Sequence, residues 1–256
     1  MKRSDLEKAV VAACGWVEES QVVIFGSQSV LGSYDEASLP EEAIRSMEVD
    51  MTPASAFTTG ADVTEKVSTL NVWVGEDSPF HLRHGVYVEG IHRDTVVLPL
   101  GWENRLVAFT ASGTGDDQNY GRTGLCLHPI DLCVSKLIAG REKDHEFVGA
   151  LIRDNIIDPA EVLDRIDKAG IDWSSGYPDN RDLAVSRARS WLQSKQAPAA
   201  EDYSDIARAL STVSRSHPRT IREHLRTNTS GAQDKSETAH DVGPDLSTER
   251  GYDLTD

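Results

Sequence analysis

The strongest constraint on the fold is an apolar run that stops at a Gly-Ser pair and is followed later by two acids on one predicted strand. Residues 21–25 are rich in β-branched side chains and predict a buried strand that ends at Gly26 and Ser27. Helical sequence follows, and a second helix is expected from the proline at position 40. Residues 48–51 alternate charged and apolar side chains, which predicts a half-buried strand. The expected order is therefore strand, turn, helix and strand.

The rest of the sequence predicts mostly strands first and helices afterwards. A capping-box spacing and an apolar stripe of helical period predict a helix over residues 4–17. Residues 62–68 look helical or turn-like. Strands are expected at residues 70–74, 85–89, 95–98 and 105–109. Helices are expected at residues 130–138 and 142–153, from residue 158 onward, and at residues 183–192. We therefore predict an α/β (α+β) fold over residues 1–196, with a mixed sheet, flanking helices and a helical C-terminal section.

The character of the chain changes after residue 196. Residues 227–256 contain no Phe, Ile, Trp or Met and many acidic, hydroxyl and glycine residues. Such a segment cannot bury enough apolar surface to offset the entropy lost on ordering it. Residues 197–256 are therefore predicted to be a largely disordered acidic tail, with one or two short helices within residues 202–225.

Charge, hydropathy and cysteine count argue against three classes of protein: one that coats nucleic acid, one that spans a membrane, and one built on disulfide bonds. The formal net charge is −16, which is unlike a protein built mainly to coat nucleic acid, although a local basic patch or a bound metal can still serve a nucleic-acid substrate. No apolar run approaches the roughly 20 residues needed to span a bilayer. The cysteine count of 3 is odd and argues against a disulfide framework. We expect a cytoplasmic protein with no membrane partner.

The Gly-Ser pair and the two acids together suggest phosphate and metal chemistry. Backbone N–H groups beside Gly26, with the hydroxyl of Ser27, are suited to hold phosphate at a helix start. Glu48 and Asp50 are two residues apart on one strand, so their carboxylates point to the same face. Mg²⁺, or Mn²⁺, typically binds one or two carboxylates together with substrate phosphates. The alternative is an ordinary turn followed by a solvated strand face.

A second group of charged residues follows in the helical section. Lys136, Gly140 and Asp144 are spaced by fours, so one continuous helix would align them. If Gly140 breaks the helix, Asp144 falls in the first turn of the next one. A surface ion-pair cluster on a solvated helix face explains the same pattern without any function.

These motifs resemble those of the nucleotidyltransferase superfamily, which has a Gly-Ser turn, a helix and then a strand with paired acids. The stretch around Lys136 and residues 140–144 is similar to the lysine and Arg/Lys-Asp elements of AbiEii-like nucleotidyltransferases, the toxins of type IV toxin–antitoxin and phage-abortive systems. The resemblance covers roughly residues 21–153. It implies that Gly26, Ser27 and Lys136 bind the nucleotide and that Glu48 and Asp50 bind metal. It also implies catalytic roles for Asp50, Lys136 and Asp144, of which Asp144 either supports catalysis or positions Lys136.

The sequence departs from this family pattern in three ways. The interval from Ser27 to Asp50 is longer than usual, and Glu48 stands where the family more often has Asp. The third carboxylate that is expected on a later strand is not evident, and the candidates are Glu89 and Asp94.

The resemblance implies a metal-dependent enzyme that moves an NMP group from an NTP to a tRNA or protein acceptor. The setting would be toxin–antitoxin or phage defence, with a cognate antitoxin as partner. Three alternatives stay open: a catalytically degenerate nucleotidyltransferase-fold binding protein, an interaction protein whose acidic tail engages a basic partner, and a small-molecule nucleotidyltransferase such as an antibiotic-modifying enzyme.

Overall fold

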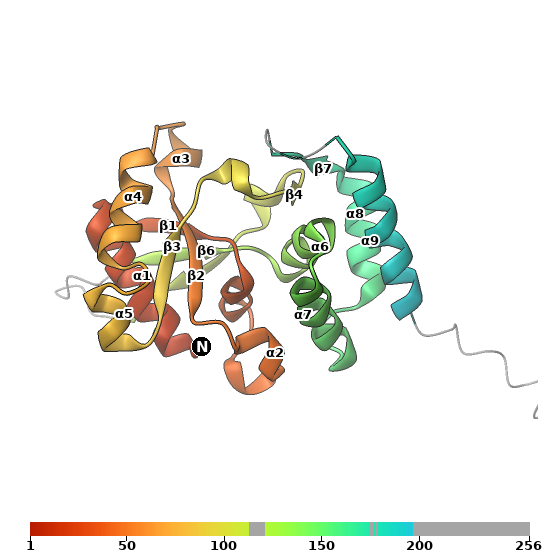
Figure 1. Cartoon of the computed structure of the whole chain (residues 1–256), viewed down its shortest axis with the longest axis horizontal. Helices are drawn as coiled ribbons and strands as arrows, with labels where there is room; N and C mark the ends of the chain where they lie inside the picture. Colours follow the sequence, from red (N-terminus) through yellow and green to blue (C-terminus); the bar gives the residue numbers. More distant parts are fainter. Residues whose placement is uncertain (113–120, 175–176, 178, 197–256) are drawn as a thin grey trace, which may run out of the picture. The chain divides into compact units, whose positions relative to one another are not determined.

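The computed structural model describes residues 1–112, 121–174, 177 and 179–196 (Figure 1). The predicted acidic tail of residues 197–256 lies outside the described residues, so its disorder stays a prediction. In the part of the chain that is described, every helix is too short or too polar to cross a membrane.

The described chain contains a five-stranded mixed sheet in the order β3-β2-β1-β6-β5. Its strands are β1 (Gln21–Ile24), β2 (Glu48–Pro53), β3 (Tyr87–Gly90), β5 (Val107–Thr110) and β6 (Thr123–Cys126). The β1–β6 and β2–β3 pairs are parallel, whereas β1–β2 and β5–β6 are antiparallel. A separate two-stranded sheet joins β4 (Leu98–Pro99) to β7 (Ile171–Asp172). The predicted α/β class with a mixed sheet is confirmed.

Helices flank the sheet and make up the C-terminal section. The N-terminal group is α1 (Arg3–Val17), α2 (Glu41–Ile44), α3 (Ser55–Thr58), α4 (Thr64–Trp73) and α5 (Pro79–His84). The C-terminal group is α6 (Pro129–Ala139), α7 (Glu142–Arg153), α8 (Pro159–Ala169) and α9 (Arg181–Lys195). Short 3₁₀ segments lie at Ser27–Gly32, Glu36–Ser38, Arg93–Thr95 and Trp102–Arg105. In Figure 1, α1, α4 and α5 lie on one side of the sheet, and α6 to α9 form the helical section on the other.

The apolar stripe of α1 packs onto the middle of the sheet, as its period predicted. A glycine makes this contact close. A Cβ added at Gly124 in β6 would come within 2.5 Å of Ile24 and 2.9 Å of Val10. Since Val22, Val23 and Ile24 of β1 are at most 1% exposed, β1 is a central buried strand, and it ends at Ile24, just before the Gly-Ser pair.

Two of the predicted strands were wrong. Residues 70–73 form the end of α4, because Val63, Val67, Leu70 and Val74 are buried at helical spacing. This helical spacing begins within residues 62–68, so both segments belong to one helix. Residues 95–98 were expected to form one strand. Thr95 instead ends the 3₁₀ turn Arg93–Thr95, and only Leu98 of this segment belongs to β4. The sequence pattern predicted neither α5 nor the short strand β6.

Candidate functional site

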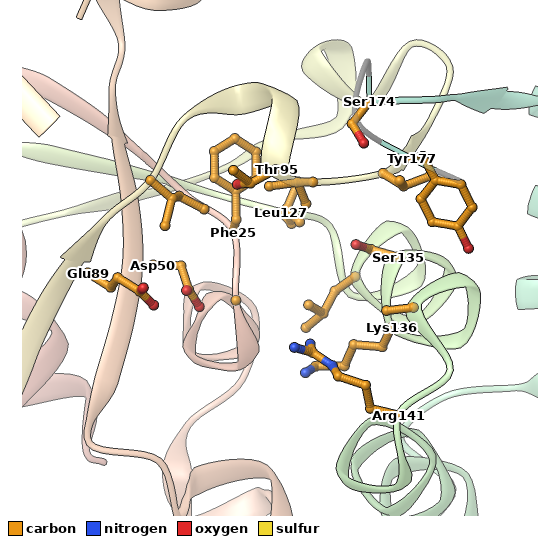
Figure 2. Close-up of a pocket in the computed structure, with 16 residues that line it drawn as sticks. Phe25, Asp50, Glu89, Thr95, Leu127, Ser135, Lys136, Arg141, Ser174 and Tyr177 are labelled. Atoms are coloured by element: carbon orange, nitrogen blue, oxygen red, sulfur yellow. The ribbon is translucent and has the colours of Figure 1, made fainter. Parts of the chain in front are cut away.

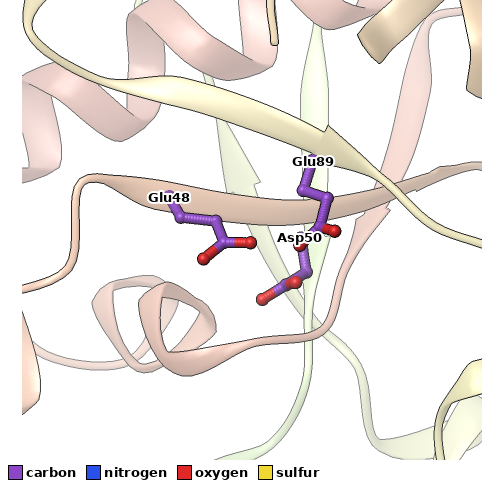
Figure 3. Close-up of side chains that lie close together, drawn as sticks. All are labelled: Glu48, Asp50 and Glu89. Carbon is purple, nitrogen blue, oxygen red and sulfur yellow. The ribbon is translucent and has the colours of Figure 1, made fainter. Parts of the chain in front are cut away.

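Three carboxylates come together on two neighbouring strands. Glu48 and Asp50 lie on β2, and the parallel register of β2 and β3 places Glu89 directly beside Asp50. One carboxylate oxygen from each of the three lies within 4.8 Å of the others (Figure 3). Of the two candidates for a third acid, Glu89 joins the pair. Asp94 lies in a 3₁₀ turn and is not part of this group.

Gly26 lies directly beneath the acid group. A Cβ at this position would fall 1.5 Å from Oδ2 of Asp50, so the carboxylate occupies the space that a side chain would need. The amide of Phe25 donates to the backbone oxygen of Asp50 at 3.0 Å, which fixes the two strands at this level. Gly26 therefore lets the acid lie against the backbone of the Gly-Ser turn.

The helix after the Gly-Ser turn is a 3₁₀ segment, Ser27–Gly32, and not the regular helix that the sequence predicted. The amide of Ser29 donates to the carbonyl oxygen of Gly26 at 3.1 Å, which closes its first turn. A short 3₁₀ segment carries a weaker aligned dipole than an α-helix. An anion held at Ser27 would therefore depend on cationic side chains as well.

Burial and mutual repulsion raise the pKa values of the β2 acids. Burial first, and then the charge of Glu89, raise the pKa of Asp50 to about 6. A hydrogen bond with Glu89, burial and the charge of Asp50 raise the pKa of Glu48 to about 8. Like charges this close disfavour joint ionisation unless a cation compensates them. This arrangement of oxygen donors is suited to a hard divalent cation.

An ion-pair group built around a buried carboxylate, Asp144, faces the acids from the helical section. Lys136 Nζ lies 3.2 Å from Oδ1 of Asp144, and Arg141 Nε lies 2.7 Å from its Oδ2. Gly140 adopts φ 66° and ends α6, so Asp144 falls in the first turn of α7. Asp144 is fully buried and Lys136 is 8% exposed. The burial of Asp144 and Lys136 contradicts the solvated-cluster interpretation for these two residues, whereas the Arg141 side chain is 61% exposed. The break at Gly140 is confirmed.

Asp144 fixes the two cations in place. Although burial opposes ionisation, the hydrogen bond from Arg141 and the charge of Lys136 lower the pKa of Asp144, so it stays ionised. Burial lowers the pKa of Lys136, whereas Asp144 acts against this change. The Lys136 ammonium also lies 4.5 Å from the ring centre of Phe147. Figure 2 shows the nitrogen atoms of Lys136 and Arg141 pointing across the cleft toward Asp50 and Glu89.

Two adjoining cavities meet at this charged centre. One, of about 390 Å³, runs from the centre along mainly apolar side chains and is called the apolar cavity; its walls include Phe25, Ile91, Val97, Leu127, Leu132 and Tyr177. The other, of about 360 Å³, is the polar cavity; its walls include Ser27, Arg45, Ser46, Glu48 and Lys143. Gly26, Asp50, Glu89, Lys136 and Arg141 line both.

The structure thus gathers the predicted site residues around one cleft. Asp144 is the exception, because it lies behind Lys136 and Arg141 and lines neither cavity. Sequence reasoning missed Arg45, Arg141 and Lys143 as parts of the cleft. Arg141 and Lys143 lie within residues 140–144, the stretch that resembles the Arg/Lys-Asp element, so the sequence held a usable signal for them. Nothing in the sequence near Arg45 indicated a site. The chain matches no protein-family model, no curated protein and no solved structure.

Proposed function

We propose that this chain is a metal-dependent nucleotidyltransferase that moves an NMP group from an NTP to an acceptor and releases pyrophosphate. The observation that carries the proposal is the group Glu48, Asp50 and Glu89 facing Lys136 and Arg141 across a cleft beside Gly26. Transfer of a phosphoryl-type group requires acids that hold a metal ion and basic side chains that hold phosphate. It is also helped by a glycine, here Gly26, that lets phosphate approach the backbone closely.

The acid group would hold Mg²⁺ or Mn²⁺. Its fit to such an ion rests on three hard carboxylate oxygens that lie within 4.8 Å of one another. When bound, the metal would neutralise charge on the phosphates and on the oxygen that leaves.

The two cavities suggest how an NTP would lie. The polar cavity offers Ser27 and Lys143 in addition to Lys136 and Arg141, which suits the β- and γ-phosphates. Arg45 also lines this cavity, with its guanidinium bonded to Glu146. The apolar cavity offers room and an apolar surface for a base. The α-phosphorus would then lie near the residues that both cavities share.

The reaction would form a bond from an acceptor oxygen to the α-phosphorus and break the bond from that phosphorus to the bridging oxygen of pyrophosphate. Glu89 is the exposed member of the acid group, so it is the acid that an acceptor hydroxyl could reach to give up its proton. Lys136 and Arg141 would compensate charge on the departing pyrophosphate. We assign Asp144 the role of a positioning residue for these two cations, because it lines neither cavity.

The acceptor that we propose is a tRNA or a protein, in a toxin–antitoxin or phage-defence setting with a cognate antitoxin. Lys143 and Arg45 on the polar cavity argue against an antibiotic-modifying enzyme, for which we expected a cleft lined by acids with no basic approach. The presence of Glu89 beside Asp50 argues against a degenerate binding protein. The interaction-protein alternative depends on the tail, which is outside the described residues.

Calorimetry with each NTP, with and without Mg²⁺, tests the proposal. We expect Mg²⁺-dependent binding of at least one NTP to the wild type, and its loss in Asp50→Asn and Glu89→Gln. Asp94→Asn is the matched control, because Asp94 is a neighbouring acid outside the group and should leave binding unchanged. Transfer of label from an α-labelled NTP to tRNA or to protein then identifies the acceptor. Folded wild type that binds no NTP in Mg²⁺ would contradict the proposal.

A further inference from the structure

A stacked pair of tryptophans is exposed on the helices that cover the side of the sheet away from the cleft. Trp16 of α1 and Trp73 of α4 have ring centres 4.5 Å apart and planes inclined by 6°. Trp16 is 45% exposed, Trp73 is 48% exposed, and the adjacent Val72 is 63% exposed. In Figure 1, α1 and α4 lie beyond the sheet as seen from α6. We call this surface, made of Trp16, Val72 and Trp73, the tryptophan platform.

The platform is held by the elements beneath it. Val67 and Leu70 of α4 and Ala13 of α1 are at most 5% exposed, so both helices are anchored in the core. Glu19, just after α1, bonds to Lys66 of α4 at 2.6 Å. The rings are therefore presented in a fixed arrangement, and a partner would bury them with little loss of side-chain entropy.

Large exposed aromatic surface of this kind is characteristic of binding sites. Tryptophan is among the residues that contribute most when an interface buries them, and two stacked indoles offer an extended flat apolar surface. A side chain that inserts beside the pair would remove apolar surface of both partners from water.

Charges near the platform select the kind of partner. Glu76 and Asp77, three and four residues after Trp73, are both exposed. The one base of residues 61–78, Lys66, is already bonded to Glu19. Glu18, two residues after Trp16, is also exposed. Negative charge here repels the phosphates of a nucleic acid, which would otherwise stack bases on the rings. It also disfavours a second copy of this chain on the same face, since the acids of both copies would meet.

We propose that the tryptophan platform docks a protein segment in which an aromatic or large aliphatic side chain is flanked by Lys or Arg. The apolar side chain covers the indole pair, and the basic side chains lie against the surrounding acids. This inference does not depend on the proposed enzymatic function, because the platform shares no residue with the two cavities.

Selection from a random peptide display library on the full-length protein is the experiment. We expect enrichment of peptides with an aromatic or aliphatic residue flanked by Lys or Arg, and binding that weakens as salt is added. The double variant Trp16→Gln/Trp73→Gln should bind a selected peptide at least about tenfold more weakly, as is usual for a central interface residue. Leu183→Gln, at an exposed leucine of α9, is the matched control and should bind as the wild type does.

A charge variant keeps the test decisive if the double Trp variant fails to fold. Glu18→Lys/Glu76→Lys changes two exposed residues, keeps both rings and should weaken the basic peptides at least severalfold. The proposal is overturned if the selected peptides bind both variants as tightly as the wild type, or if the selection enriches acidic peptides. So does competition by single-stranded RNA at the platform. A wild-type dimer in light scattering that the Trp variant dissociates would assign the platform to a second copy instead.

Discussion

Replacing Gly26 by Ala tests whether the acid group depends on the bare backbone beneath it. An added Cβ would lie 1.5 Å from Oδ2 and 2.7 Å from Cγ of Asp50. Because real Cβ atoms stay at least 3.0 Å from such neighbours, the carboxylate has to swing away from its present position. The φ of Gly26 is −46°, outside the left-handed region, and the three atoms nearest to the added Cβ all belong to Asp50. We therefore expect the main effect on Asp50.

The expected loss is larger for metal binding than for stability. Overpacking costs about 1–3 kcal/mol, and we expect the lower end here because a short side chain can rotate out of the way. Rotation of Asp50, however, removes one of three oxygen ligands from its place. Loss of correct ligand orientation commonly weakens metal binding about 10- to 100-fold. We therefore expect Gly26→Ala to fold but to bind Mn²⁺ at least about tenfold more weakly.

Calorimetric titration with Mn²⁺ and unfolding by urea measure the two effects separately. Gly15→Ala is the control, because a Cβ on Gly15 in α1 meets nothing within 4 Å. That change should leave Mn²⁺ binding as it is and should stabilise the protein by about 0.5–1 kcal/mol, as is typical of Gly→Ala inside a helix. A folded Gly26→Ala protein that binds Mn²⁺ as tightly as the wild type would refute the reasoning.

Two further predictions concern the charges. The pKa of the half-buried Asp50 is raised from 3.8 to about 6, so the metal-free native state binds protons more tightly than the unfolded chain. The free energy of unfolding should therefore fall by about 3 kcal/mol as pH rises from about 4 to above 6. Urea unfolding across this range checks the sign, and Mg²⁺ or Asp50→Asn should reduce the fall; a rise over the same window contradicts it. Asp144→Ala should cost about 3–5 kcal/mol by leaving Lys136 buried without its partner. Adding Lys136→Met should recover much of that loss, and an equally unstable double variant would show that the ion pair is not the cause.

The sequence by itself determined the features that depend on neighbours along the chain. The start of α8 is one case, because Asp158 accepts a hydrogen bond from the amide of Ala160 at 2.8 Å, as an N-cap before a proline predicts. The common face of Glu48 and Asp50 is another, since it follows from the period of a strand. The end of β1 shortly before Gly26 and the break at Gly140 were predicted for the same reason. Where the period was read over too short a window, as at residues 70–74, the assignment failed.

Only the tertiary structure decided what lies next to the paired acids. The parallel register of β2 and β3 brings Glu89 to Asp50, and the packing of α6 and α7 brings Lys136 and Arg141 to face them. These residues are far apart in sequence, so no local period or cap relates them. Their juxtaposition depends on strand pairing and on burial of the apolar faces of distant elements. Those are properties of the whole fold, and this is why the sequence predicted two members of the acid group but left the third open between Glu89 and Asp94.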